Sequence, residues 1–153
     1  MSNARVRRAG RDDAEVVARL LDAFNTEFDT SSPGVDVLAV RLRQLLGGTE
    51  LVALLIGDPP AGVAVISFRR NVWFPGPVAL LDEMYVQPDR RNGGLGSILL
   101  AAACDLARDQ GSELLEINVD GEDHDARRFY ERHGFADRDP GQAEPQLYYS
   151  RDL

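Results

Sequence analysis

The segment Arg90-Arg-Asn-Gly-Gly-Leu-Gly-Ser97 joins an apolar, strand-like run, Val78 to Val86, to a helical pattern that extends from Ile98 to Gln110. Its three glycines let the backbone turn tightly, so that consecutive N–H groups can point at one ligand. The first turn of the helix adds N–H donors without helical partners and the positive end of the helix dipole. The segment therefore predicts a loop that binds phosphate or diphosphate groups.

The same loop excludes two common phosphate-binding motifs. A Walker loop ends in Gly-Lys-Ser/Thr, and the chain contains no lysine. The dinucleotide fingerprint needs a third glycine three residues after the second, and Leu99 stands at that position after Gly94 and Gly96. We therefore expect neither a Walker-type nucleoside triphosphatase nor a nicotinamide enzyme.

Two motifs in this region resemble one known family. Arg91-x-x-Gly94-x-Gly96, after a strand that ends Tyr85-Val86, resembles the acyl-CoA signature of the GNAT superfamily of N-acetyltransferases. Downstream, the run from Ala126 to Phe135 resembles the second hallmark of that family, a short helix that carries a tyrosine and ends in Gly-Phe. The two motifs occur in the family's order, and the resemblance covers approximately residues 79–136.

Apolar periodicity predicts the secondary structure along the chain. Strands are expected over residues 4–8, 51–56, 62–68, 78–86, 113–119, from 135 onward and over 146–152. Helices are expected after Asp12 or Asp13, over 35–45, after the glycine loop and over 124–133. One side of the helix after the loop is expected to be formed by Leu95, Ile98, Leu99, Ala102 and Leu106.

This order of elements predicts an α/β (α+β) fold, with a mixed sheet and helices on both of its faces. At 153 residues the chain is expected to form one domain, residues 1–153. The resemblance implies a mostly antiparallel, GNAT-like acyl-CoA N-acyltransferase fold. It also implies that the strand before the glycine loop carries a bulge and splays from the strand after it.

The resemblance implies acetyl-CoA as the acetyl donor. The pantetheine arm would pair with the strand backbone at Met84 and Val86, as an added strand does. The implied contacts are Met84, Tyr85, Val86, Arg91, Asn92, Gly93, Gly94, Leu95, Gly96, Ser97 and Asp123. Two positions depart from the family: Gly93 replaces a long polar or cationic residue, and Asp123 replaces a frequent asparagine.

The implied reaction is direct attack of an amine on the acetyl thioester, which needs a proton acceptor, a donor to the carbonyl oxygen and an acid for the departing thiolate. The resemblance assigns the donor to the Val86 N–H and the acid to Tyr130. Tyr130 is alternatively an ordinary core aromatic, because it lies at helical spacing with Ala126 and His133.

Glu83 is the preferred base, with a pKa raised by partial burial. Asp82 precedes it directly, so regular strand alternation would turn the two carboxylates to opposite faces, although a bulge could change this. The alternative is that both are merely solvated or paired in salt bridges.

Composition limits the partners. The net charge of −8 argues against nucleic acid and favours a cationic acceptor. The N-terminus lacks the apolar core of a signal peptide, and no apolar run is long enough to span a membrane, so a cytoplasmic protein without a membrane partner is expected.

Cys104 is interpreted as a buried thiol rather than a nucleophile. His124 and His133 are interpreted as structural, and no metal is expected because their spacing fits no metal-binding pattern.

The acceptor is expected to be an amine of a small molecule or peptide that the sequence does not identify. Asn25, Glu27 and Phe28 are candidate wall residues of its site, and Trp73-Phe74 could pack at a homodimer interface. Two function classes stay open: an acetyl-CoA-dependent N-acetyltransferase, and a non-catalytic acyl-CoA-binding sensor or interaction module. Glu83 and Tyr130 favour the enzyme.

Overall fold

A computed structural model describes residues 4–153 of the chain. Its contacts divide the chain into two compact units, one ending at Ile117 and one formed by Asn118–Leu153, and each is described by itself. The expectation of a single domain over residues 1–153 stays a prediction.

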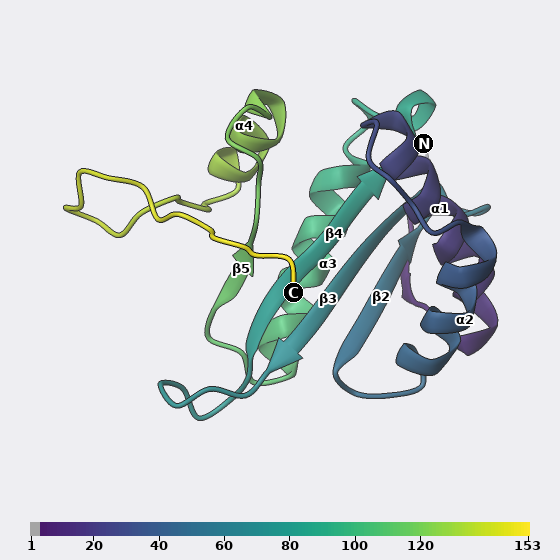
Figure 1. Ribbon diagram of the computed structural model, residues 1–153, viewed down its shortest axis with the longest axis horizontal. Helices are drawn as coiled ribbons and strands as arrows, with labels where there is room; N and C mark the ends of the chain where they lie inside the picture. Colours follow the sequence, from purple (N-terminus) through teal and green to yellow (C-terminus); the bar gives the residue numbers. More distant parts are fainter. Residues whose placement is uncertain (1–3) are drawn as a thin grey trace. The chain divides into compact units, whose positions relative to one another are not determined.

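The first unit is built on a five-stranded sheet with the strand order β1-β2-β3-β4-β5 (Figure 1). The strands are β1 (Val6–Arg8), β2 (Leu51–Ile56), β3 (Gly62–Arg69), β4 (Val78–Val86) and β5 (Leu115–Ile117). Neighbours from β1 to β4 are antiparallel, whereas β5 joins β4 in parallel. The predicted mixed, mostly antiparallel sheet is confirmed, although β5 is shorter than the expected strand over 113–119.

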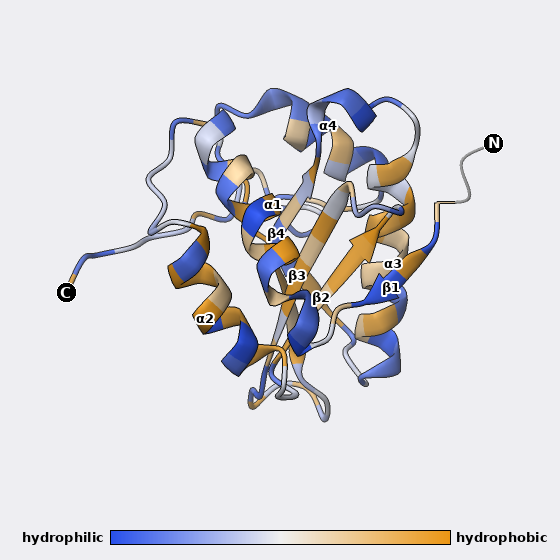
Figure 2. Cartoon of the chain, turned by 90° about the vertical axis from the view of Figure 1, so that its right-hand side faces the viewer, coloured by the Kyte–Doolittle hydropathy of each residue, from blue (hydrophilic) through white to orange (hydrophobic). Residues whose placement is uncertain are grey.

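Helices cover both faces of this sheet, as predicted. The helices are α1 (Ala14–Glu27), α2 (Val35–Leu45) and α3 (Leu95–Asp109), with short 3-10 turns η1 (Arg11–Asp13) and η2 (Pro88–Arg90). One face packs its buried residues Ala53, Leu55, Val63 and Val65 into a core with α1 and α2. The alternate residues of β2 and β3 are also buried, and α3 contacts β2, β3 and β4 (Figure 2). None of the described helices has the length and apolar character needed to cross a membrane.

The apolar face predicted for α3 was partly wrong. Its buried side chains are Leu95, Leu99, Leu100, Ala103 and Ala107, whereas Ile98 is 43% exposed. The buried stripe follows steps of four residues from Leu95, and the sequence pattern could not distinguish this row from the neighbouring one because both contain apolar residues. Cys104 is only partly buried beside the stripe, and this burial raises the pKa of its thiol, which disfavours a nucleophilic thiolate.

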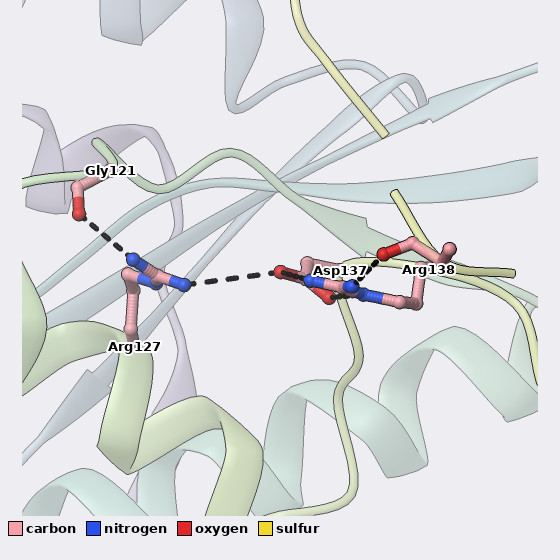
Figure 3. Close-up of polar contacts among 5 residues, drawn as sticks. Gly121, Arg127, Asp137 and Arg138 are labelled. Carbon is pink, nitrogen blue, oxygen red and sulfur yellow. Dashed lines mark hydrogen bonds and ion pairs between the residues drawn. The ribbon is translucent and has the colours of Figure 1, made fainter. Parts of the chain in front are cut away.

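The second unit contains one helix, α4 (His124–Arg132), whose predicted start is confirmed. Asp123 caps it, since its carboxylate accepts a hydrogen bond from the Ala126 N–H at 3.0 Å. Arg127 of α4 donates to the Gly121 carbonyl at 3.0 Å and forms an ion pair with Asp137 at 3.9 Å (Figure 3). Through these contacts, residues before and after α4 are bonded to the helix.

The two strands predicted from residue 135 onward and over 146–152 were wrong. Beyond α4, the described residues form turns and extended segments without a strand. Their backbone bonds are local, such as Gln142 N–H to Asp139 O at 3.1 Å and Gln146 N–H to Asp137 O at 2.7 Å. Alternating apolar residues such as Leu147 and Tyr149 form a strand only where another strand completes the ladder.

Candidate active site

The sheet loses one pairing partner part-way along β4. In the first unit β4 pairs with β5 only over Ala79–Leu81, opposite Leu115–Ile117. After Leu81, β4 pairs with β3 alone as far as Val86. One edge of β4 after Leu81 therefore has no strand partner in this unit, and the splay of the two strands that the resemblance implied stays a prediction.

Met84 and Val86 present their backbone groups to that edge. The Gln87 N–H donates to the Ala61 carbonyl at 2.8 Å on the β3 side. Hydrogen-bonded and non-hydrogen-bonded positions alternate along an antiparallel ladder, so Gln87 and every second residue before it bond toward β3. The N–H and C=O groups of Met84 and Val86 point the other way, to the edge at which the sequence predicted pairing with a pantetheine arm.

A β-bulge interrupts β4 immediately before this edge. Glu83 pairs with Val65 and Leu81 pairs with Ile66, so Asp82 has no register partner on β3. The bulge that the resemblance implied is therefore confirmed.

The bulge turns the Asp82 and Glu83 carboxylates to the same face of the sheet. Glu83 shares the face of its partner Val65, and Asp82 forms a hydrogen bond with Ser67, which is two residues from Val65 on β3. Regular alternation would place the two on opposite faces, and the bulge, which was the stated alternative, changes this because its extra residue breaks the strict alternation of strand side chains.

Burial and charge combine to raise the pKa of the Glu83 carboxyl. Desolvation is the larger cause, and the neighbouring Asp82 charge adds to it. Desolvation also raises the pKa of Asp82, and the hydrogen bond from Ser67 opposes that shift. Because Asp82 is the more exposed residue, solvent screens its shift more, and Glu83 is the better proton acceptor near neutral pH.

An aromatic cluster lies on the same face, between β4 and α1. Tyr85 is 6% exposed and stacks on Phe24, with ring centroids 5.2 Å apart. Phe28 packs edge-on against Phe24 at 5.3 Å and is 52% exposed. Phe28 is thus available to an acceptor, whereas the Tyr85 ring is part of the core. Asn25 donates to the Ser31 carbonyl at 3.0 Å and closes the loop after α1.

The glycine loop is open and carries two residues in the left-handed region. Asn92 has φ 64° and Gly94 has φ 86°, and a side chain built at Gly93 or Gly94 would meet no atom within 4 Å. The first helical bond of α3 runs from Ile98 N–H to Gly94 O at 3.1 Å, so the N–H groups of Leu95 and Gly96 have no acceptor inside the helix. This geometry suits an anion, as the sequence predicted for the loop.

Arg91 is held by partners within the first unit. Its Nε donates to the Val86 carbonyl at 2.8 Å, and Nη1 and Nη2 donate to the Glu27 carboxylate at 2.8 and 2.9 Å. Sequence reasoning missed this link, since Glu27 was considered only as a wall residue and no local pattern connects positions 64 apart.

Tyr130 and Asp123 belong to the second unit. The Tyr130 ring lies 5.2 Å from that of Phe129 and 5.7 Å from that of Phe135, between centroids. The His133 ring, 4.5 Å from Phe129, also contacts the Phe129 carbonyl through Nδ1 at 2.7 Å. The proposed acid role of Tyr130 and the coenzyme contact of Asp123 stay predictions. Among residues 4–153, no group of three or more His, Cys, Asp or Glu could hold a metal ion.

Comparison with known proteins assigns the chain to a family. The model of the acetyltransferase (GNAT) family matches residues 17–135, which is more than half of the chain. The chain belongs to the GNAT family of acetyltransferases. The resemblance that the glycine loop and the Tyr130 region suggested is therefore confirmed.

Individual relatives agree with this assignment. The chain is 32% identical over 138 residues to a mycothiol acetyltransferase of Beutenbergia cavernae, a match that covers 86% of this chain but 44% of the relative. The chain therefore spans less than half the length of that relative. A crystal structure from Arthrobacter sp. FB24, described as a candidate acetyltransferase, is 60% identical, with a TM-score of 0.92 and coverage of 97% of this chain and 96% of that one.

A third comparison supports the fold alone. An aminoglycoside N-acetyltransferase solved in complex with CoA is 18% identical, with a TM-score of 0.80 and coverage of 100% of this chain and 97% of that one.

The raised pKa of Glu83 predicts a stability cost that depends on pH. Folding opposes ionisation of this carboxyl, so the free energy of unfolding should fall as pH rises from the ordinary Glu pKa, about 4.3, through the raised value. Glu83→Gln removes that cost, and we expect this variant to be more stable than the wild type at neutral pH.

The gain should shrink as pH falls through about 4.3 and disappear by about pH 3, where the carboxyl is protonated in both the folded and the unfolded chain. Denaturant unfolding at neutral and at acidic pH measures this gain in the free energy of unfolding. Glu113→Gln is the control, because it changes an exposed carboxylate. A gain that persists unchanged in acid, or that the control shares, would contradict the account.

Proposed function

We propose that the chain is an acetyl-CoA-dependent N-acetyltransferase that moves an acetyl group to a primary amine of a small molecule or peptide by direct attack. The observation that carries the proposal is the open edge of β4 after Leu81, which continues into the glycine loop. The loop amides suit the diphosphate, and the edge at Met84 and Val86 suits the amides of a pantetheine arm. Bound acetyl-CoA would supply the activated acetyl group.

Glu83 is the proton acceptor in this proposal. The attacking amine must lose a proton from its ammonium form, and Glu83 directly precedes Met84 on β4, with a raised pKa that suits a general base. Asp82 on the same face adds negative charge, which attracts the ammonium. The exposed Phe28 ring offers a face to the cation or to its apolar part.

The reaction also needs stabilisation of the carbonyl oxygen and of the departing sulfur. The Val86 N–H points to the open edge and is the proposed donor to the carbonyl oxygen. Glu83 takes the ammonium proton before the free amine attacks. As the N–C bond forms and the C–S bond breaks, the thiolate takes a proton, for which Tyr130 is the proposed donor, and the second proton lost by the amide nitrogen returns Tyr130 to its phenol form.

The acceptor is proposed to be cationic. The net charge of −8 and the paired carboxylates of β4 favour an amine over an anionic acceptor. The CoA-bound neighbour is an aminoglycoside N-acetyltransferase, and polycationic amines are therefore a sensible first group to screen.

The proposal predicts that acetyl-CoA stabilises the fold in proportion to the logarithm of its concentration once binding is saturated. Calorimetry and thermal unfolding with acetyl-CoA measure this effect, and an amine library assayed for free thiol then tests turnover. Absence of both binding heat and stabilisation would contradict acyl-CoA binding. Tight binding without turnover on any amine would favour the non-catalytic sensor instead.

Tyr130→Phe tests the acid. Loss of the hydroxyl should lower kcat by about a hundredfold or more, which is the usual scale for a general acid, while the Kd of acetyl-CoA stays unchanged. Tyr148→Phe is the control, because Tyr148 lies in the same unit and is 73% exposed. Equal kcat in Tyr130→Phe and the wild type would remove Tyr130 from this role and favour a purely structural aromatic.

A further inference from the structure

The Arg91 guanidinium is held in one orientation by two elements of the first unit. Its Nε bonds the Val86 carbonyl, and its two Nη atoms bond the two oxygens of Glu27 at the end of α1. The side chains of Arg91 and Glu27 are 37% and 27% exposed. Bidentate arginine–carboxylate pairs combine charge with a fixed planar geometry, so this pair restricts rotation of the guanidinium.

The Tyr85 ring contacts the Arg91 guanidinium from the side of the core. The guanidinium carbon of Arg91 lies 5.5 Å from the centroid of the Tyr85 ring. Burial and the Glu27 charge raise the pKa of the Tyr85 hydroxyl, which also hydrogen-bonds to Glu27. Because the ring stacks on Phe24 of α1, the end of α1 and the end of β4 are joined by both polar and aromatic contacts. We call Glu27, Tyr85 and Arg91 the clamp.

The clamp acts on the main chain at the open edge. Within a strand, the N–H and C=O of one residue point the same way, so the Val86 carbonyl held by Arg91 lies on the same edge as the Val86 N–H. The peptide that joins Val86 to Gln87 is bonded at both ends, to Arg91 Nε and to the Ala61 carbonyl. The Val86 N–H belongs to the preceding peptide, which joins Tyr85 to Val86 and whose carbonyl points toward β3. The peptides on both sides of Val86 are therefore held, which leaves its N–H little freedom to turn away from the edge.

We propose that Glu27 is a positioning residue for acetyl transfer: by holding Arg91 on the Val86 carbonyl, it fixes the direction of the Val86 N–H. The inference rests on the proposed function, in which this N–H donates to the acetyl oxygen. It also changes the part expected of Arg91. With its charge paired to Glu27, Arg91 orients the strand end, and the loop amides hold the diphosphate.

Glu27→Gln tests the proposal, because it keeps the size of the side chain and removes its charge. We expect kcat to fall about tenfold to a hundredfold, the scale of a small misalignment of reacting groups, while the Kd of acetyl-CoA changes much less. Glu15→Gln is the matched control, since Glu15 lies on the same helix in an exposed ion pair with Arg19 at 3.0 Å. The control should keep the wild-type kcat.

The result also distinguishes two roles of Arg91. If Arg91 were a diphosphate ligand that Glu27 merely restrains, Glu27→Gln would free it and tighten acetyl-CoA binding. Tighter binding, or an unchanged kcat, would overturn the proposal. Arg91→Lys keeps the positive charge but lacks the two guanidinium nitrogens that bind both Glu27 oxygens. The loss in kcat caused by Arg91→Lys should therefore not add to the loss caused by Glu27→Gln in the double variant. Fully additive losses would also overturn the proposal.

Hydrogen exchange separates failure of this inference from failure of the proposed function. Glu27→Gln should speed exchange of the Gln87 amide, which is bonded to the Ala61 carbonyl, while the amides of α1 around Val17 keep their protection. If no amine is acetylated by the wild type but Gln87 exchange still increases, the transferase function fails and the clamp stands. Unchanged Gln87 exchange overturns the clamp whatever the activity.

Discussion

The loss of strand pairing beyond Leu81 is the constraint on which the site depends. Each N–H and C=O of a strand needs a partner, and at the end of β4 only one side of the strand is paired with another strand, while on the other side the Val86 carbonyl accepts from Arg91. On the other side, the backbone groups of Met84 and Val86 point outward, as they would toward a further strand. β4 leads through η2 directly into the glycine loop, so the open edge and the loop follow one another along the chain within the first unit.

The bulge at Asp82 makes this edge chemically useful. Without it, strand alternation would place Asp82 and Glu83 on opposite faces, and only one carboxylate could meet an acceptor. With it, both share the face on which Tyr85, Phe24 and Phe28 lie. The raised pKa of Glu83 is a cost to the folded state at neutral pH, and it is the property that suits a general base.

Much of the fold could be predicted from local patterns. The bounds of β2 and β4 and the start of α4 followed from apolar runs and caps, because these signals act over a few residues. The strands expected after residue 135 were wrong for the complementary reason: alternation shows that a segment could pair, not that a partner strand is present.

The site was predictable where it depends on the main chain and less so where side chains from distant positions meet. The glycine spacing identified the loop, and the resemblance identified the open edge. The bond between Glu27 and Arg91 had no local signal, since 17 basic and 25 acidic residues allow many pairs and only the tertiary structure selects this one. The shared face of Asp82 and Glu83 likewise depends on one unpaired residue in the β3–β4 register.

Backbone amide chemical shifts during a titration with CoA test the central claim most directly. The account predicts that the largest changes fall on the amides of Met84, Val86 and the loop from Asn92 to Gly96. Tyr85, whose backbone groups bond toward β3, should change less than its two neighbours on β4. Saturable binding that leaves Val86 and the loop unchanged, or that moves Tyr85 more than Met84 and Val86, would contradict it.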